Sequence, residues 1–392
     1  MEAAADLTWK GYSVAERDRR WKAVRERGAA AGLDCVFVPL GDGLDGEYLT
    51  GFTTAVVVMP TDGRLPIVIQ DHKGATNAWI RETRYANREW AQLSAQALLD
   101  AGMERARIGV VGLKGGTVTH VRAPGGVVVH TPYAQDVKGA LPHATFEDAT
   151  DVVGFVRYVK SDEEIECLRR SAALAEAGVE RMVELARPGL DEAVLYASVT
   201  ERMLELGSAY YDWALETGPL GHEEVQHRST VPPVGRRLKA GELVNNEVTA
   251  IFGSMLSQEV QPILLGPLPQ DWQPLIDLQR EVFEAGLDRM RPGVTFGELI
   301  DFTNGFSKRP GLNTAITLHG RGMGDDGPLI TARASGSSIR DLALQKGNAF
   351  VWKPYAQTPD ARWRFNFGAT VVIGENGAER LSSRPPGMIC IE

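Results

Sequence analysis

The segment Leu318–Pro328 places His319 between apolar and glycine residues and follows it with Arg321 and the acidic pair Asp325 and Asp326. An imidazole is well suited to exchange protons near neutral pH, and it is also the commonest metal ligand. The run Asp-Asp-Gly-Pro is typical of a turn, because these residues favour tight backbone conformations. His319 is therefore a candidate base or metal ligand just before a turn.

Composition and charge limit the kinds of protein to consider. The length of 392 residues predicts two or three domains. The composition, 43% hydrophobic and 24% charged, predicts that a large buried core can form. A net charge of −9 argues against nucleic acid as a partner, and no apolar run is long enough for a membrane span. The N-terminus lacks signal-peptide features. Cys35, Cys167 and Cys390 are odd in number and far apart, which favours a reducing cytoplasm. We expect a cytoplasmic protein with a small-molecule substrate.

The first part of the chain alternates between helical and strand-like patterns. Apolar runs predict strands, and amphipathic stretches predict helices between them. Such alternation is typical of an α/β sheet domain, which we predict to span residues 1–155. The expected helices cover 13–31, 77–81 and 89–103, and the expected strands cover 35–38, 56–59, 67–69 and 108–111.

The second part of the chain contains an internal repeat. Residues 177–182 resemble residues 285–290, and each stretch is followed by Arg-Pro-Gly and a second amphipathic helix. Ser161 and Glu164 predict a capping box at the start of the first long helix. The repeat predicts that residues 156–392 form two duplicated ααβ halves, which close on a curved sheet and leave a pocket between them. The expected helices cover 161–186, 190–206 and 294–306, and the expected strands cover 242–252, 348–352 and 369–373.

The order of these motifs resembles the pita-bread family of creatinase, Xaa-Pro aminopeptidases and methionine aminopeptidases. Leu318–Pro328 is similar to the family's His-Gly-x-Gly signature, Lys160–Ile165 to the start of its catalytic domain, and Tyr48–Phe52 to part of its N-terminal domain. The resemblance covers nearly the whole chain. It implies an α/β (α+β) protein with an N-terminal mixed α/β domain before the pita-bread domain. It also implies a homodimer whose N-terminal domain completes the neighbour's pocket.

In the peptidases of this family, one histidine and four carboxylates hold two metal ions. The resemblance places the histidine on His319 and the first acidic ligand on Glu247 or Asn246. Two close divalent cations need shared carboxylates to offset their repulsion, and a lysine ammonium would add to it. We therefore expect no metal and no other cofactor, although a single metal on His319 and Glu247 stays open. The other three ligands fall on Ser257 or Gln258, on Lys353 and near Gly368.

One branch of the family, the creatinase-like hydrolases, works without metal. The resemblance places the catalytic histidine of that branch on His227, its glutamate on Glu259 and its second histidine on His319. His227 would take a proton from water and return it to the leaving nitrogen. Glu259 would orient the substrate or the histidine, and His319 would hydrogen-bond a developing oxyanion.

Charged and aromatic side chains are expected to bind the substrate. Lys353 stands where creatinase keeps a glutamate, which disfavours guanidinium recognition, and it could instead bind a carboxylate or stabilise an oxyanion. Arg321 and Arg333 add positive charge near the same loop, and Glu247 and Trp352 complete the set. These residues predict hydrolysis of a C–N bond, in an amide or amidine, of a small anionic or zwitterionic amino-acid-like substrate.

Several alternatives stay open. The scaffold could serve a lyase or another non-hydrolytic enzyme with His227 or Lys353 as base, or an inactive Xaa-Pro aminopeptidase homologue used for binding, since fold does not fix function. Glu259 could be a solvated residue at a strand edge. Glu247 could pair with a neighbouring Lys or Arg, and Lys353 could be a core lysine that pairs with a carboxylate.

Overall fold

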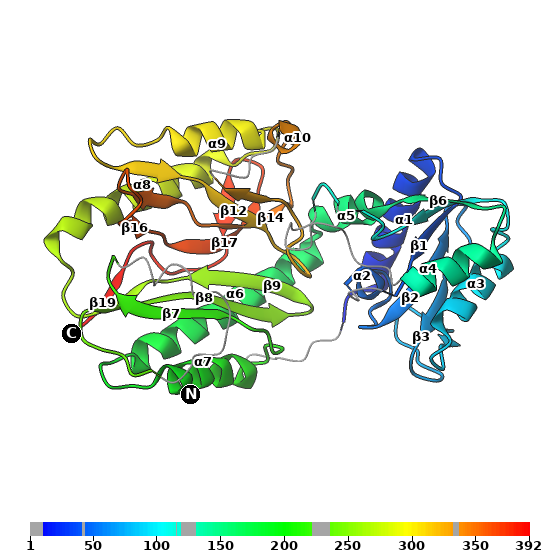
Figure 1. Ribbon diagram of the computed structural model, residues 1–392, viewed down its shortest axis with the longest axis horizontal. Helices are drawn as coiled ribbons and strands as arrows, with labels where there is room; N and C mark the ends of the chain where they lie inside the picture. The colour runs from blue at the N-terminus through cyan, green and yellow to red at the C-terminus, as the bar shows by residue number, and fades with distance from the viewer. Residues whose placement is uncertain (1–10, 41–43, 115, 119–130, 222–235, 332–336) are drawn as a thin grey trace. The chain divides into compact units, whose positions relative to one another are not determined.

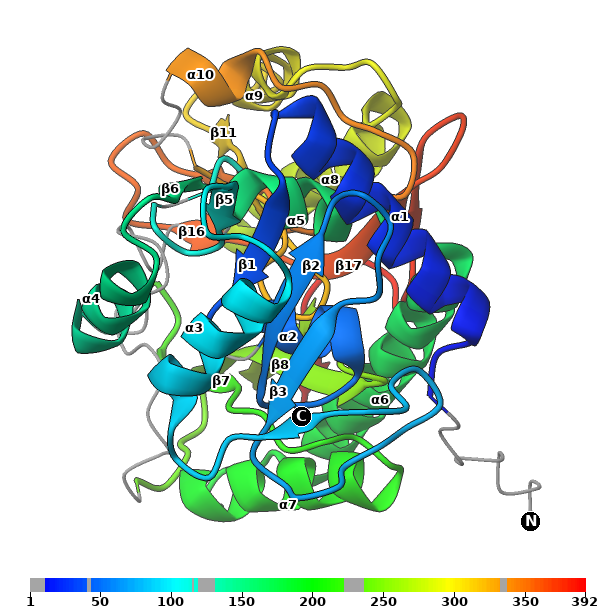
Figure 2. The same cartoon turned by 90° about the vertical axis from the view of Figure 1, so that its right-hand side faces the viewer.

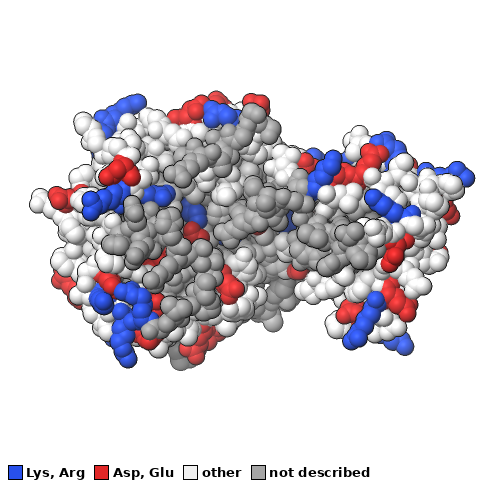
Figure 3. Space-filling model, in the orientation of Figure 1, with Lys and Arg blue, Asp and Glu red and all other residues white. Residues whose placement is uncertain are grey.

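The computed structural model describes residues 11–40, 44–114, 116–118, 131–221, 236–331 and 337–392. The chain divides between Tyr158 and Val159, close to the predicted boundary at 155, and each unit is described by itself. Figure 1 labels the elements of both units. On the face drawn in Figure 3, the described acidic and basic side chains are interspersed on each unit. Within the described residues, no helix combines the length and apolar character needed to cross a membrane.

The N-terminal unit is built on a six-stranded mixed sheet with the order β4-β3-β2-β1-β5-β6. Figure 2 shows β1, β2 and β3 side by side, and β1 pairs antiparallel with β2 but parallel with β5. This arrangement confirms the predicted mixed α/β architecture. The strands are β1 (Cys35–Val38), β2 (Ala55–Pro60), β3 (Ile67–Gln70), β4 (Arg84–Tyr85), β5 (Arg107–Val110) and β6 (Thr145–Asp148). The helices are α1 (Val14–Ala30), α2 (Leu44–Thr50), α3 (Trp90–Asp100), α4 (Thr131–Ala140) and α5 (Thr150–Tyr158).

The helix predicted over 77–81 does not form, and that prediction was wrong. The side-chain oxygen of Asn77 accepts hydrogen bonds from the backbone N–H groups of Trp79 and Ile80, both at 2.8 Å. An Asn side chain that bonds its own backbone in this way closes a turn and competes with helix propagation. Asn77 therefore fixes a turn between β3 and β4.

The C-terminal unit contains a ten-stranded sheet with the order β13-β12-β14-β17-β9-β8-β10-β19, in which β18 pairs with β17 and β7 pairs with β8. A small second sheet has the order β11-β15-β16. The strands are β7 (Ala214–Pro219), β8 (Glu242–Phe252), β9 (Met255–Val260), β10 (Ile263–Leu265), β11 (Asn313–Ala315), β12 (Thr317–Gly320), β13 (Leu329–Thr331), β14 (Ala349–Trp352), β15 (Tyr355–Gln357), β16 (Arg364–Phe365), β17 (Gly368–Ile373), β18 (Ala378–Arg380) and β19 (Ile389–Ile391).

The helices of this unit repeat in two matched pairs, as the sequence predicts. Ser161 and Glu164 form the expected capping box, in which each side chain bonds the other residue's backbone N–H. Gly178 and Gly286 occupy equivalent places in the two long helices. A Cβ atom added at Gly178 would lie 3.0 Å from the sulfur of Met203, and one added at Gly286 would lie 2.4 Å from the Trp352 ring. Both helices can therefore pack this closely because these residues are glycine. The helices are α6 (Asp162–Leu185), α7 (Glu192–Glu205), η2 (Gln270–Trp272), α8 (Gln273–Arg289), α9 (Phe296–Asn304) and α10 (Ser337–Arg340).

Candidate functional site

A charged cluster joins three neighbouring regions of the large sheet. The Nζ atom of Lys353, just after β14, donates hydrogen bonds to Oε1 of Glu247 on β8 at 2.5 Å and to Oε1 of Gln258 on β9 at 3.2 Å. Nε2 of Gln258 donates to Oε2 of Glu247 at 3.3 Å, which closes a triangle. We call Lys353, Glu247 and Gln258 the lysine cluster. The sequence left each of Glu247 and Lys353 open to pair with an oppositely charged side chain, and in the structure they pair with each other.

Strand register explains why these side chains meet. His319 on β12 lies opposite Val351 on β14, so both side chains point to the same face of the sheet. Lys353 follows Val351 by two residues and shares that face because strand side chains alternate. Thr249 lies opposite Gln258, and Glu247 precedes Thr249 by two residues. The cluster and His319 therefore occupy one face of the sheet.

His319 is almost completely buried and is held beside a second ion pair. Its Nδ1 atom lies 3.3 Å from Oδ1 of Asp325, and the same oxygen accepts a hydrogen bond from Nη1 of Arg321 at 2.5 Å. Burial and the positive charges of Arg321 and Lys353 lower the pKa of His319 to about 3, although Asp325 acts in the opposite direction. The imidazole is therefore neutral at pH 7 and can act as a hydrogen-bonding group.

Glu247 keeps its negative charge within this cluster. Burial by itself would raise the pKa of Glu247, but attraction to Lys353 and the hydrogen bond from it outweigh this effect. His319 and Arg321 contribute in the same direction, and the pKa falls to about 2. Glu247 is thus an ionised partner that holds the lysine ammonium in place.

The residues at the five positions where the family resemblance places metal ligands do not fit a dinuclear metal centre. Gln258 is a neutral amide bonded to Lys353, and Lys353 places a cation among the other donors. Gly368 offers no side chain, and a Cβ atom there would meet the Cβ atom of Lys353 at 2.5 Å. His319 and Glu247 are the two remaining donors, and Glu247 is already bonded to Lys353. Within the described residues, no group of three or more His, Cys, Asp or Glu side chains is placed to hold a metal ion.

Glu259 and Trp352 lie on the opposite face of the sheet from His319. Trp352, Ala369 and Glu259 face one another across β14, β17 and β9, which gives all three side chains the same direction. Burial holds the pKa of the Glu259 carboxyl well above its usual range, and the nearby hydroxyl belongs to Ser382. The structure therefore does not bring Glu259 to the predicted site, nor does it leave Glu259 solvated at a strand edge.

Trp352 packs in the core beneath α8. Its Nε1 atom donates to the backbone oxygen of Phe283 at 3.0 Å, and its ring fills the space left by Gly286. Trp352 therefore does not bind substrate as predicted, because its side chain points into the core. The side chain of the next residue, Lys353, points to the opposite face of the sheet, where His319 lies. His227 and Arg333 lie outside the described residues, so their predicted roles stay predictions.

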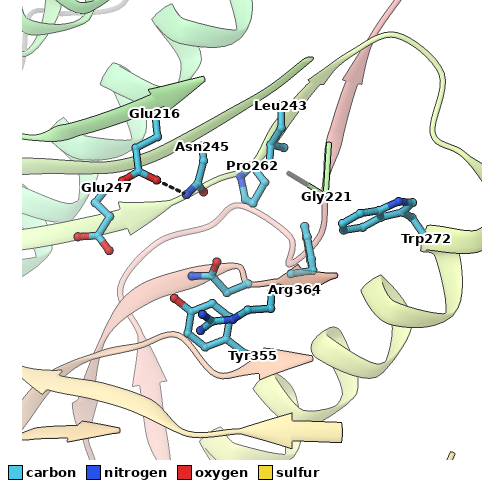
Figure 4. A pocket seen from close by; sticks show the side chains of 11 residues that line it. Glu216, Gly221, Leu243, Asn245, Glu247, Pro262, Trp272, Tyr355 and Arg364 are labelled. Atoms are coloured by element: carbon cyan, nitrogen blue, oxygen red, sulfur yellow. Dashed lines mark hydrogen bonds between the residues drawn. The ribbon is translucent and has the colours of Figure 1, made fainter. Parts of the chain in front are cut away.

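A cavity of about 150 Å³ borders Glu247 (Figure 4). Glu216 of β7 and Asn245 of β8 line one side, and Tyr355 and Arg364 line the other. The Arg364 guanidinium lies over the Tyr355 ring, 4.0 Å from its centroid. Trp272 lines the cavity at the right of Figure 4. The cavity thus combines a carboxylate wall with a cationic and aromatic wall.

Glu216 has an unusual proton affinity for a carboxyl group. Burial and the negative charge of Glu247 raise the pKa of Glu216 to about 7, although a hydrogen bond from Asn245 acts against the shift. The sequence interpretation missed Glu216, Asn245 and Arg364. The local sequence signal is weak: Glu216 follows the apolar residue Leu215, and the structure shows that the buried side chain of Leu215 alternates with it along β7.

Comparison with known proteins places this geometry in context. Residues 166–376 match Metallopeptidase family M24. The "Uncharacterized hydrolase/peptidase y4tM" of Sinorhizobium fredii is 26% identical over 307 residues, which are 72% of this chain and 74% of the relative. The "Probable dipeptidase PepE" of Mycobacterium tuberculosis is 27% identical over 266 residues, which are 65% of this chain and 66% of the relative.

Two solved structures show the likeness of the fold. The X-Pro aminopeptidase from Thermotoga maritima has a TM-score of 0.75 at 16% identity, over 95% of this chain and 99% of that chain. The Xaa-Pro dipeptidase from Bacillus anthracis has a TM-score of 0.76 at 18% identity, over 96% of this chain and 100% of that chain. The fold expected from the sequence motifs is confirmed.

Proposed function

We propose that this chain, which belongs to metallopeptidase family M24, is a hydrolase that cleaves a C–N bond in a small substrate. We also propose that the enzyme works without a dinuclear metal centre. Curated relatives are named as hydrolases, peptidases or dipeptidases, which supports the hydrolytic class. The single observation that carries the metal-independent part is the lysine cluster. Its ammonium group donates to Glu247 and Gln258, at positions where the resemblance places metal ligands.

We infer that the lysine ammonium, which bonds the cavity-lining residue Glu247, supplies the positive charge that an oxyanion needs. A preorganised cation or N–H donor stabilises the charge that develops on a carbonyl oxygen during attack by water. Lys353 is fixed by two hydrogen bonds and needs little reorganisation, and neutral His319 can act as a hydrogen-bonding group beside it. His227 lies outside the described residues, and its part as a base stays a prediction.

The cavity suits a small substrate that carries both charges. Arg364 offers a planar guanidinium, which pairs well with a carboxylate. Ionised Glu247 on the opposite wall can accept a hydrogen bond from an ammonium or amide N–H group. A dipeptide or an amidino amino acid carries both charges, and an N-acyl amino acid carries the carboxylate together with an amide N–H group. The named activities of the relatives favour the dipeptide within this class.

The proposal is tested by turnover of a substrate panel in the presence of a chelator. The panel contains Xaa-Pro and other dipeptides, N-acyl amino acids and amidino amino acids, and the products are measured by mass spectrometry in ¹⁸O-labelled water. A hydrolase incorporates one labelled oxygen into the product, whereas a lyase incorporates none and a binding protein gives no product. Turnover that requires an added metal would contradict the metal-independent part.

Variants of two lysines connect the result to the cluster. Lys353→Met should lower turnover by at least about 100-fold, the loss typical of removing one oxyanion-stabilising group. Lys346→Met is the matched control, because Lys346 is exposed and pairs with Glu375 at the surface. Equal activity of the two variants would remove Lys353 from the mechanism.

A further inference from the structure

Strand pairing presents Glu216 to the cavity beside Glu247. In the β7–β8 ladder, Glu216 lies opposite Asn245 and Ala214 lies opposite Glu247. Glu216 and Glu247 are therefore diagonal neighbours on the same side of the ladder, a relationship that brings Cβ atoms to within about 7–8 Å. Figure 4 shows both carboxyl groups on the same wall of the cavity. Thr217, the next residue along β7, turns the other way and bonds Glu192.

The two neighbouring carboxyl groups differ in how they are held. Glu247 uses both oxygens in bonds to Lys353 and Gln258 and is fixed as an anion. Glu216 receives a long hydrogen bond of 3.4 Å from the neutral amide of Asn245. A group that is bonded weakly and to a neutral partner can lose and regain a proton without breaking an ion pair. Of the two, Glu216 is the one able to exchange protons.

The charged and titratable groups that face Glu216 come from three strands of this unit. Glu247 of β8 is negative and adjacent, while Tyr355 of β15 and Arg364 of β16 lie across the cavity. Burial and the charge of Glu247 raise the pKa of Glu216 to about 7, so both protonation states are populated near neutral pH. A general base or acid is most efficient when its pKa lies near the working pH.

Resting on the proposed hydrolase function, we propose that Glu216 is the catalytic group that moves the proton during cleavage of the C–N bond. The Glu216 carboxylate takes one proton from water while the water oxygen forms a bond to the substrate carbon. The C–N bond then breaks, and Glu216 returns this proton to the nitrogen, which leaves as an amine. The carboxylate is restored, and the step needs no oxidant, reductant or further reactant.

Infrared titration of the intact protein tests the proton affinity of Glu216 without any substrate. The carboxyl band that is present in the wild type and absent in Glu216→Gln should titrate with a midpoint of about 7. Glu184→Gln is the control, because Glu184 is exposed on α6 and outside the cavity lining, so this variant should keep the band with a midpoint of about 7. A midpoint for Glu216 near that of an ordinary glutamate would overturn the inference, whether or not a substrate has been found.

The pH profile of kcat/KM on a substrate from the panel tests the role in catalysis. The wild-type rate should rise with pH through the region of about 7 as Glu216 loses its proton. In Glu216→Gln, the rate should fall by about 100- to 10,000-fold and lose this rising limb. Glu216→Asp should keep the limb at a reduced rate. A merely structural role would change stability or KM and leave the limb in place.

His227 is the competing candidate for the same step. If the rising limb persists in Glu216→Gln and disappears in His227→Gln, the histidine is the base and the inference for Glu216 is overturned. Failure of the wild type to hydrolyse any member of the panel would count against the proposed function. In that case the infrared midpoint still decides whether Glu216 exchanges protons near neutral pH.

Discussion

The Nζ atom of Lys353 lies 2.5 Å from Oε1 of Glu247, although 106 residues separate the two along the chain. The resemblance places acidic metal ligands at Lys353 and at Glu247 or Asn246, and Lys353 carries the opposite charge. The pair therefore balances its charge internally, with Gln258 bonded to both members. Each charged group of the lysine cluster therefore has a partner of opposite sign within the cluster.

The first prediction concerns the stability of this pair. Lys353→Met leaves the Glu247 carboxylate without its cation and should lower the free energy of unfolding by about 1–3 kcal/mol. The Glu247 side chain is 33% exposed, so the loss should be smaller than for a fully buried charge. Urea unfolding of the wild type, Lys353→Met, Glu247→Gln and the double variant measures the coupling free energy between the two residues.

The outcome of this cycle distinguishes a pair from two independent residues. If Lys353 and Glu247 act as a pair, the double variant should be more stable than the sum of the two single losses predicts. Strict additivity of the two losses would show that the residues do not stabilise each other, contrary to the geometry.

The second prediction concerns Gly368, which lies beside Lys353. A Cβ atom at Gly368 would meet the Cβ atom of Lys353 at 2.5 Å, so Gly368→Ala should displace the lysine and lower stability by about 1–3 kcal/mol. Gly139→Ala is the control, because Gly139 lies in α4 and has nothing within 4 Å of the added atom. Gly139→Ala should be neutral or slightly stabilising, as expected for alanine in a helix. Thermal unfolding that ranks the two variants in the opposite order would contradict the packing seen at Gly368.

Sequence information predicted the elements of the site better than the directions of its side chains. The resemblance left Glu247 or Asn246, and Ser257 or Gln258, as equivalent choices. A shift of one residue turns a strand side chain to the other face, so the choice depends on the register between β8 and β9. The misplacement of Glu259 has the same cause, because it is the neighbour of Gln258.

Glu216 was missed for a related reason. Its chemical setting depends on the pairing of β7 with β8, which places Glu247 diagonally beside it. Nothing in the local sequence specifies that long-range pairing. By contrast, the capping box at Ser161 depends on residues three positions apart and was predicted correctly. Local hydrogen-bond patterns were thus predictable from the sequence, while contacts that require strand register were not.

The third prediction concerns the pH dependence of stability due to Glu247. Its pKa in the folded protein is about 2, below the ordinary glutamate value of 4.5. A group with a depressed folded pKa stabilises the fold above its unfolded pKa and loses this contribution as the pH falls toward the folded value. The free energy of unfolding should therefore fall between about pH 4.5 and pH 2, and this slope should be smaller in Glu247→Gln.

The quantity to compare is the difference in the free energy of unfolding between the wild type and Glu247→Gln at each pH. His319 also has a lowered pKa, to about 3, and its contribution is lost over a range that extends from pH 6.5 downward. Urea unfolding at several pH values for the wild type and Glu247→Gln separates the two effects, since His319 is present in both. Parallel curves below pH 4.5 would show that Glu247 titrates normally in the folded protein.

The central claim is that Lys353, held by Glu247, stands in place of a metal centre in a working hydrolase. The most direct measurement is the metal content of catalytically active protein by mass spectrometry, together with its rate before and after removal of metal by a chelator. We predict well below one ion per chain, and a rate that neither chelation nor added Mn²⁺, Zn²⁺ or Co²⁺ changes. One or two tightly bound ions per chain, with activity that is lost on chelation and restored by metal, would contradict the claim.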